Sequence, residues 1–168
     1  EFMRSDKPFA PAIVTPKPFV HGPQTAKVIG EGEIDCDEHG RILVRFHWDR
    51  KSDQSRRVRV AQVWASQNWG AIFTPRIGME VVVEFLEGDP DQPIITGRVY
   101  NKESMPPYKL PDFKTMSTIK SNSSKGGGGF NELRFEDKKG EEQVFIHAER
   151  QMDIRVKKNC YEWIGEER

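Results

Sequence analysis

Apolar and polar residues alternate with a period of two at several places along this 168-residue chain, and this pattern constrains the fold most strongly. Successive residues of a β-strand point to opposite faces, so the alternation predicts strands that are buried on one side only. Within 41–48, for example, Ile42, Val44 and Phe46 share one face. Residues 80–86 repeat the pattern and are rich in β-branched side chains, which favour strands. The alternation therefore predicts an all-β protein.

Five strand-like segments lie within about eighty residues, which is the proportion of a five-stranded OB-type barrel. The segments are 26–36, 41–48, 57–63, 80–86 and 94–100. The longest irregular connector falls between the third and the fourth segment. A small closed barrel hides its strand edges, although other small β-barrels have similar strand counts. The alternation predicts a barrel core made of Ile42, Val44, Phe46, Val81, Val83 and Phe85.

Changes in composition divide the chain into four stretches. Residues 1–19 are dense in proline and predict an extended lead-in, of which 1–2 resemble a cloning remnant ahead of Met3. Residues 20–103 would form the barrel, and 104–131 are rich in Pro, Gly and Ser and predict a linker. The four glycines 126–129 indicate either flexibility or a point where backbones crowd closely.

The last stretch, 132–168, alternates again but holds too little apolar surface to form a core of its own. We expect it to find that core in other copies of the chain, with neighbours such as Arg134 and Glu136 in water. The alternative is that the stretch folds back on the barrel. The residues predicted to face the shared axis are Leu133, Phe135, Val144, Ile146, Ile154 and Val156.

No group of residues predicts catalysis, a cofactor or a metal site. Cys36 and His39 are close in sequence, but no second Cys/His pair stands at zinc spacing. His47 is explained as a polar-face strand residue, and the carboxylates of 87–91 as turn chemistry. Cys36 and Cys160 lie far apart in sequence and are interpreted as free thiols. We expect no enzymatic activity.

The alternative function is an OB-fold module that binds nucleic acid. Such modules combine a basic groove with stacking aromatics, and the candidates are Arg50, Lys51, Arg56, Arg57, Arg59, Trp48, Trp64 and Trp69. Against this, the formal net charge is zero, and Trp48 falls on the apolar face of its predicted strand. No run of eighteen apolar residues and no signal peptide is visible, so stable membrane insertion is not expected.

Several stretches together resemble one protein family, the VgrG spike proteins of type VI secretion systems. They cover most of the chain from about 16 to 165. In the barrel region they are Thr15-Pro16-Lys17-Pro18, His21-Gly22-Pro23-Gln24-Thr25-Ala26, Gly40-Arg41, Phe46-His47-Trp48-Asp49-Arg50, Trp69-Gly70-Ala71, Pro75-Arg76-Ile77-Gly78, Phe85-Leu86-Glu87-Gly88-Asp89-Pro90-Asp91, Pro93-Ile94-Ile95-Thr96-Gly97 and Val99-Tyr100-Asn101. After the barrel they are Ser123-Ser124-Lys125-Gly126-Gly127-Gly128-Gly129 and Asn131-Glu132-Leu133-Arg134-Phe135-Glu136-Asp137.

The resemblance implies a homotrimer similar to the spike of contractile phage tails, with an OB-fold neck and a triple-stranded, intertwined β-helical shaft. It implies a cell-puncturing role, in which the spike caps a tube of haemolysin-coregulated protein and carries tip and effector proteins. It also implies assembly in the bacterial cytoplasm and secretion by the type VI system without a signal peptide. On this interpretation the chain is a fragment covering the neck and the first strands of the shaft.

Overall fold

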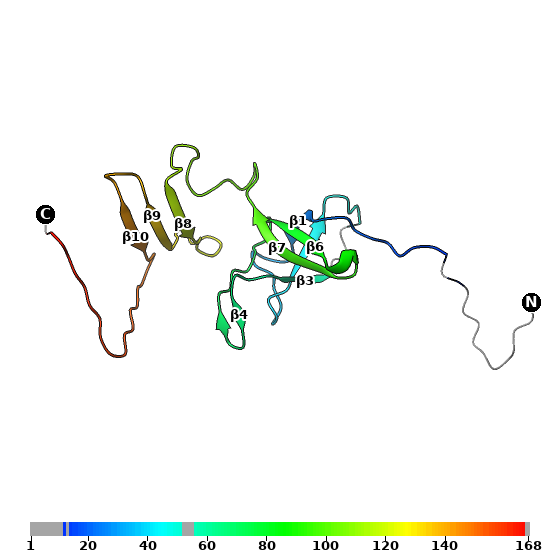
Figure 1. Cartoon of the computed structure of the whole chain (residues 1–168), viewed down its shortest axis with the longest axis horizontal. Helices are drawn as coiled ribbons and strands as arrows, with labels where there is room; N and C mark the ends of the chain where they lie inside the picture. The colour runs from blue at the N-terminus through cyan, green and yellow to red at the C-terminus, as the bar shows by residue number, and fades with distance from the viewer. Residues whose placement is uncertain (1–11, 13, 52–55, 167–168) are drawn as a thin grey trace, which may run out of the picture. The chain divides into compact units, whose positions relative to one another are not determined.

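The computed structural model describes residues 12, 14–51 and 56–166, which fall into two compact units that meet between Met105 and Pro106. Strands dominate both units, and a short 3-10 helix, η1 (Leu86–Gly88), is the helical element of the described residues (Figure 1). This confirms the all-β class. The division near residue 105 places the predicted lead-in and barrel in the first unit.

The first unit is a closed barrel of five strands. The strands are β1 (Gln24–Ile29), β2 (Ile42–Phe46), β3 (Arg57–Val60), β6 (Glu80–Phe85) and β7 (Pro93–Val99). They close in the order β1-β2-β3-β7-β6, and every pair is antiparallel except β3 with β7. The five-stranded OB-type barrel predicted from the alternation is therefore confirmed, because closure gives each strand two neighbours.

The barrel core contains the inward residues of β2 and β6. Ile42, Val44, Val81 and Val83 are buried in one cluster. The other buried members are Ala26, Val28, Val58 and Ile95. The two phenylalanines of the predicted core, Phe46 and Phe85, are only half-buried and pack against this cluster with ring centroids 5.8 Å apart. Both stand at the last residue of their strand, where the barrel opens to solvent.

The placement of Trp48 on an apolar face is wrong. Strand β2 ends at Phe46, so Trp48 lies beyond the paired residues and is 67% exposed. Its indole N–H donates to Gln24 Oε1 at 2.8 Å, and its ring stacks on Phe46 with centroids 5.1 Å apart. Alternation assigns a face only while strand pairing continues, and here the pairing has stopped.

The segments around the barrel are tied to it by specific contacts. Of the predicted lead-in 1–19, residues 1–11 and 13 lie outside the described residues. Further along, Val20 N–H donates to the carbonyl of Gly88 at 2.9 Å. The Phe19 ring lies so close to Gly88 that a Cβ there would come within 2.3 Å of it. The connector between β3 and β6 contains a two-stranded hairpin, β4 (Ala65–Ser66) with β5 (Trp69–Gly70).

Ion pairs hold the loop that precedes β2. Asp35 accepts from Arg57 at 2.6 Å, and Asp37 accepts from Arg41 Nε at 2.7 Å. Asp37 Oδ1 also accepts the backbone N–H groups of His39 and Arg41 at 3.0 and 2.9 Å. Desolvation raises the pKa of Asp37, but the hydrogen bonds from Arg41 and His39 outweigh it and lower the pKa to about 2.

This lowered pKa predicts acid sensitivity. A carboxylate whose folded pKa lies below its ordinary value of 3.8 contributes stability that is present above that value and is lost as the pH falls towards 2. We expect Asp37→Asn to lower the urea midpoint at neutral pH and to flatten its fall between about pH 4 and 2. The exposed neighbour provides the control, since Glu38→Gln should leave the profile unchanged. An Asp37→Asn profile that keeps the wild-type slope would contradict this role.

The second unit contains a three-stranded antiparallel sheet. Its strands are β8 (Met116–Lys120), β9 (Glu132–Glu136) and β10 (Gln143–His147), in the order β10-β9-β8. Strand β8 falls inside 104–131, which the sequence predicts as a linker; that range is therefore not irregular throughout. Strands were expected at 152–157, but the described residues 148–166 form none and are exposed (Figure 1).

Candidate functional site: an unpartnered sheet face

The register of the second sheet collects its apolar residues on one side. Val144 pairs with Phe135, and Ile146 pairs with Leu133. On the other side of β9, Ile119 is also opposite Leu133. Because directly paired residues point to the same face, these five side chains form one surface. We call it the apolar face: Ile119, Leu133, Phe135, Val144 and Ile146.

The apolar face is open to solvent in the single chain. Val144 is 65% exposed and Ile146 is 59% exposed, and the remaining three residues are also classed as exposed. A contiguous patch of five large apolar side chains is uncommon on a monomeric soluble protein and marks an interaction surface. The strands have their hydrogen-bonding partners within the chain, so it is the face, and not the backbone, that lacks a partner.

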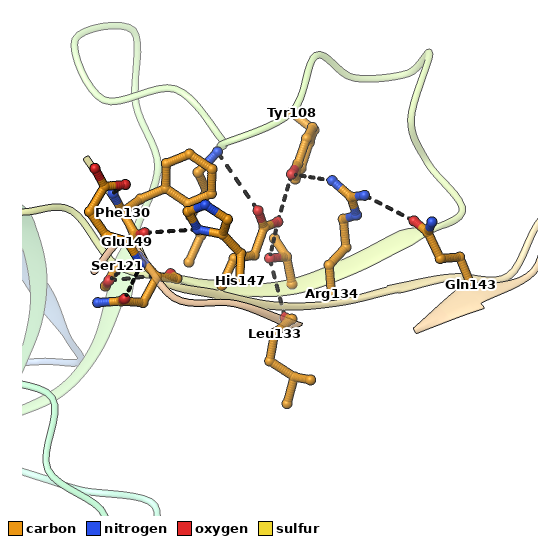
Figure 2. A network of polar contacts seen from close by, with 12 residues as sticks. Tyr108, Ser121, Phe130, Leu133, Arg134, Gln143, His147 and Glu149 are labelled. Carbon is orange, nitrogen blue, oxygen red and sulfur yellow. Dashed lines mark hydrogen bonds and ion pairs between the residues drawn. The ribbon is translucent and has the colours of Figure 1, made fainter. Parts of the chain in front are cut away.

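The opposite face of the same sheet is closed by a polar network around Glu132, which is 4% exposed. Tyr108 O–H donates to Glu132 Oε1 at 2.6 Å, and Thr118 Oγ1 donates to the same oxygen at 2.8 Å. The guanidinium of Arg134 donates to Tyr108 Oη at 2.8 Å and to Gln143 Oε1 at 3.0 Å. Figure 2 shows Leu133 pointing to the side of the sheet away from Tyr108 and Arg134.

The charges in this network are mutually stabilised. Desolvation raises the pKa of Glu132, but hydrogen bonds from Tyr108 and Thr118 and the positive charges of Lys120 and Arg134 lower it below its ordinary value overall. Lys120 Nζ lies 4.0 Å from Glu132 Oε2 and 3.9 Å from the centre of the Phe130 ring. A buried carboxylate held in this way fixes the sheet against the segment that carries Tyr108.

The expectation that Arg134 and Glu136 lie in water is wrong. Both are partly buried, and the guanidinium of Arg134 lies 4.4 Å from the centre of the Phe145 ring. Residues before β8, including Tyr108, cover this face. The charged side of the sheet is therefore the covered side, while the apolar side is exposed. This inversion has a simple reason, since the apolar side is reserved for a partner that one chain does not supply.

The glycine run adopts a crowded turn between β8 and β9. Gly129 is buried, and a Cβ there would lie 2.1 Å from the carboxyl carbon of Glu149. The Glu149 carboxylate accepts Phe130 N–H at 3.2 Å, while its own N–H donates to Asn131 Oδ1 at 2.9 Å. Of the two interpretations of 126–129, close backbone approach holds at Gly129.

This crowding predicts that Gly129→Ala destabilises the second sheet. The added methyl would force Glu149 away from Phe130 and lose that hydrogen bond, at a cost of about 1–3 kcal/mol for the displaced contacts. Amide exchange of Glu132–Glu136 should accelerate accordingly. Gly126→Ala provides a control for crowding, because open space surrounds that position although its φ of +86° adds backbone strain. Unchanged protection of β9 in Gly129→Ala would contradict the packing described here.

Four of the six residues predicted to face a shared axis come together on one surface: Leu133, Phe135, Val144 and Ile146. The other two, Ile154 and Val156, lie in the exposed stretch 148–166 and join no strand of the described residues. That all six face a shared axis stays a prediction. Sequence reasoning missed Ile119 because β8 is short and surrounded by Pro, Gly and Ser. It also missed Tyr108, for which no local signal existed.

The residues considered for chemistry do not assemble into a site. Cys36 and Cys160 are free and exposed. Asp89 accepts Asp91 N–H at 2.9 Å and a hydrogen bond from the Gln92 side chain at 3.1 Å, as turn residues do. No cluster of three or more His, Cys, Asp or Glu suited to a metal ion occurs among the described residues. The part of the chain that the structure describes also contains no helix with the length and apolarity needed to cross a bilayer.

Two family models match the two units separately. Residues 25–100 match the type VI secretion system/phage-baseplate injector OB domain, which covers the barrel strands. Residues 117–168 match the bacteriophage T4 gp5 C-terminal trimerisation domain, which covers the sheet with the apolar face and the stretch that follows it. The barrel is thus similar to an injector domain, and the unpartnered face lies within a match to a trimerisation domain.

Curated relatives extend the match over nearly the whole chain. The chain is 57% and 55% identical to the type VI secretion system spike proteins VgrG1c and VgrG1b of Pseudomonas aeruginosa, over 95% of its own length and 23% of theirs. It is 53% identical to the actin cross-linking toxin VgrG1 of Vibrio cholerae, over 82% of its length and 13% of that protein. The matched families are structural. The toxin name describes a protein of which this chain covers a small part.

Proposed function

The chain belongs to the VgrG family of type VI secretion spike proteins, and on this premise we propose that it forms the neck and the first part of the shaft of a homotrimeric, cell-puncturing spike. The chain spans about a quarter of its relatives' length, so the spike itself is the larger assembly. In this assembly the barrel forms the neck and the second unit begins the shaft.

The observation that carries this proposal is the apolar face. Its five large apolar side chains are exposed on a sheet whose other face is closed around Glu132, and the match to a trimerisation domain covers its residues. Three copies that turn their apolar faces inward would remove these side chains from water, at about 25 cal/mol for each Å² buried. The function is mechanical, so it requires a stiff joint between copies and no catalytic cleft.

The further partners follow from the family. We propose that the assembled spike caps a tube of haemolysin-coregulated protein and carries tip and effector proteins. We also propose that it is assembled in the bacterial cytoplasm and leaves the cell through the type VI system. The nucleic-acid alternative gains no support, since the basic cluster is partly neutralised: Arg57 pairs with Asp35 at 2.6 Å, and Arg56 lies 4.0 Å from Asp91.

Mass in solution combined with hydrogen exchange tests the trimer. Light scattering should give three times the chain mass at high concentration and one chain mass on dilution, because association must offset lost translational freedom. Amides of 153–156, which form no strand in the described single chain, should exchange fast in the dilute sample and slow markedly as the trimer forms. Those of Gln143–His147 should slow as well.

Equal, strong protection of 153–156 at every concentration, in a chain that weighs one subunit, would overturn the proposal. It would mean that this stretch packs on its own chain. A control for general concentration effects is the barrel strand β6, whose amides already have partners in β1 and β7. Their protection should not depend on concentration.

A further inference from the structure

A second apolar surface lies on the barrel unit, and the spike role does not account for it. The sixteen residues 60–75 contain no Asp, Glu, Lys, Arg or His, in a chain whose charged fraction is 31%. They form the β4–β5 hairpin and the segments on either side, and Figure 1 shows the hairpin extending away from the barrel. Its exposed large side chains are Val63, Trp64, Trp69, Ile72 and Phe73.

The hairpin is a rigid element and not a loose loop. Gly70 takes a φ of 138°, and a Cβ there would come within 2.5 Å of the Trp64 carbonyl oxygen. Ala71 N–H donates to that oxygen at 2.9 Å, and Phe73 N–H donates to Gln62 Oε1 at 3.0 Å. The Arg98 guanidinium, which comes from β7, donates to the Phe73 carbonyl. The apolar side chains are thus held in fixed positions while they stay exposed.

The composition of this surface is that of the core of a permanent interface. Such cores are depleted of charged residues and enriched in aromatics, and here two tryptophans meet edge to face with ring centroids 5.1 Å apart. In an assembly of identical copies, any charge near the symmetry axis would be repeated and would repel its images. A surface free of charge over sixteen residues avoids that repulsion.

The covalent link between the two units limits how far apart the barrels of a trimer can be. Asn101 is fixed to the barrel through Glu80 Oε2 at 2.7 Å, and Tyr108 is fixed to the second unit through Glu132. The chain from Asn101 to Tyr108 spans at most about 25 Å when fully extended. Three second units joined on one axis would therefore hold three barrels at a millimolar effective concentration of one another.

We propose that the charge-free hairpin, residues 60–75, packs against the barrel of a second copy of this chain and forms a second trimer contact, in addition to the apolar face. This inference rests on the proposed homotrimer. It assigns the neck its own contact between copies, so that the joint between neck and shaft does not depend on the shaft alone. A contact of this kind would resist the rotation of one barrel against another under axial load.

Photo-crosslinking of the full chain tests the contact. A p-benzoylphenylalanine placed at Ile72, which is 73% exposed in the single chain, should crosslink trimers on illumination. Peptide mass spectrometry should place the second site within residues 14–105 of another copy. The same photo-crosslinker at Glu38, an exposed turn residue remote in sequence from the hairpin, is the matched control and should give far less intermolecular product.

A charge on the same position provides a second measurement. Ile72→Glu places one charge in each of the proposed contacts and should raise the concentration for half-assembly at least about tenfold, whereas Glu38→Gln should leave it unchanged. The far-ultraviolet spectrum of each variant shows whether the barrel stays folded.

The outcomes separate the inference from the proposed function. A sample that trimerises by light scattering but gives no crosslink from position 72, or gives one to residues 106–166, overturns the hairpin contact and leaves the trimer standing. Unchanged assembly of Ile72→Glu does the same, and it would leave the hairpin for a lipid surface or for another part of the longer spike protein. A chain that weighs one subunit at every concentration overturns both.

Discussion

Ile146→Asp should abolish the trimer while the second sheet of each single chain remains folded. Ile146 is 59% exposed in the single chain and pairs with Leu133 at the centre of the apolar face, so the change costs little before assembly. In a trimer, three carboxylates would be desolvated near one axis, at several kcal/mol each. The concentration for half-assembly should rise more than about a thousandfold, which is roughly 4 kcal/mol.

Sedimentation across a dilution series measures this shift. The control is Lys139→Asp, which introduces the same side chain at an exposed position in the turn between β9 and β10. It should assemble as the unchanged chain does. Ile146→Asp that still forms trimers at the original concentration would show that the apolar face is covered by something other than a second copy.

Ile42→Ala should be the most damaging of the conservative truncations in the barrel. Ile42 has no exposed surface and lies in the cluster that contains Val44, Val81 and Ile95. Its truncation leaves a cavity in a closed barrel with little freedom to collapse, so the free energy of unfolding should fall by about 2–5 kcal/mol. Urea unfolding of the full chain, followed by a probe in the first unit, measures the loss.

Two further truncations calibrate this result. Phe46→Ala should cost less than the about 3–5 kcal/mol usual for a fully buried phenylalanine, because Phe46 stands half-buried at the end of β2. Arg45→Ala, on the exposed face of the same strand, should change stability by less than about 0.5 kcal/mol. A loss at Phe46 larger than that at Ile42 would show that the centre of the core lies nearer the barrel mouth.

The barrel could be predicted from the sequence because its signal is local. Alternation assigned Ile42, Val44, Val81 and Val83 to one side of their strands, and closure of five strands then left that side facing inward. The same reasoning failed at Trp48, where pairing stops after Phe46. A face is defined by the neighbouring strand as much as by the residue's own position, and where that neighbour ends is not encoded locally.

The second sheet separates the two kinds of information most clearly. By itself, the sequence determined that Leu133, Phe135, Val144 and Ile146 share a surface, because the period of two and the short turn after β9 set the register. Only the tertiary structure decided which surface is covered. Tyr108, more than twenty residues earlier, reaches Glu132 and Arg134 and closes the charged side. Burial depends on which distant segment packs on a strand, and that contact has no periodic signature in the chain.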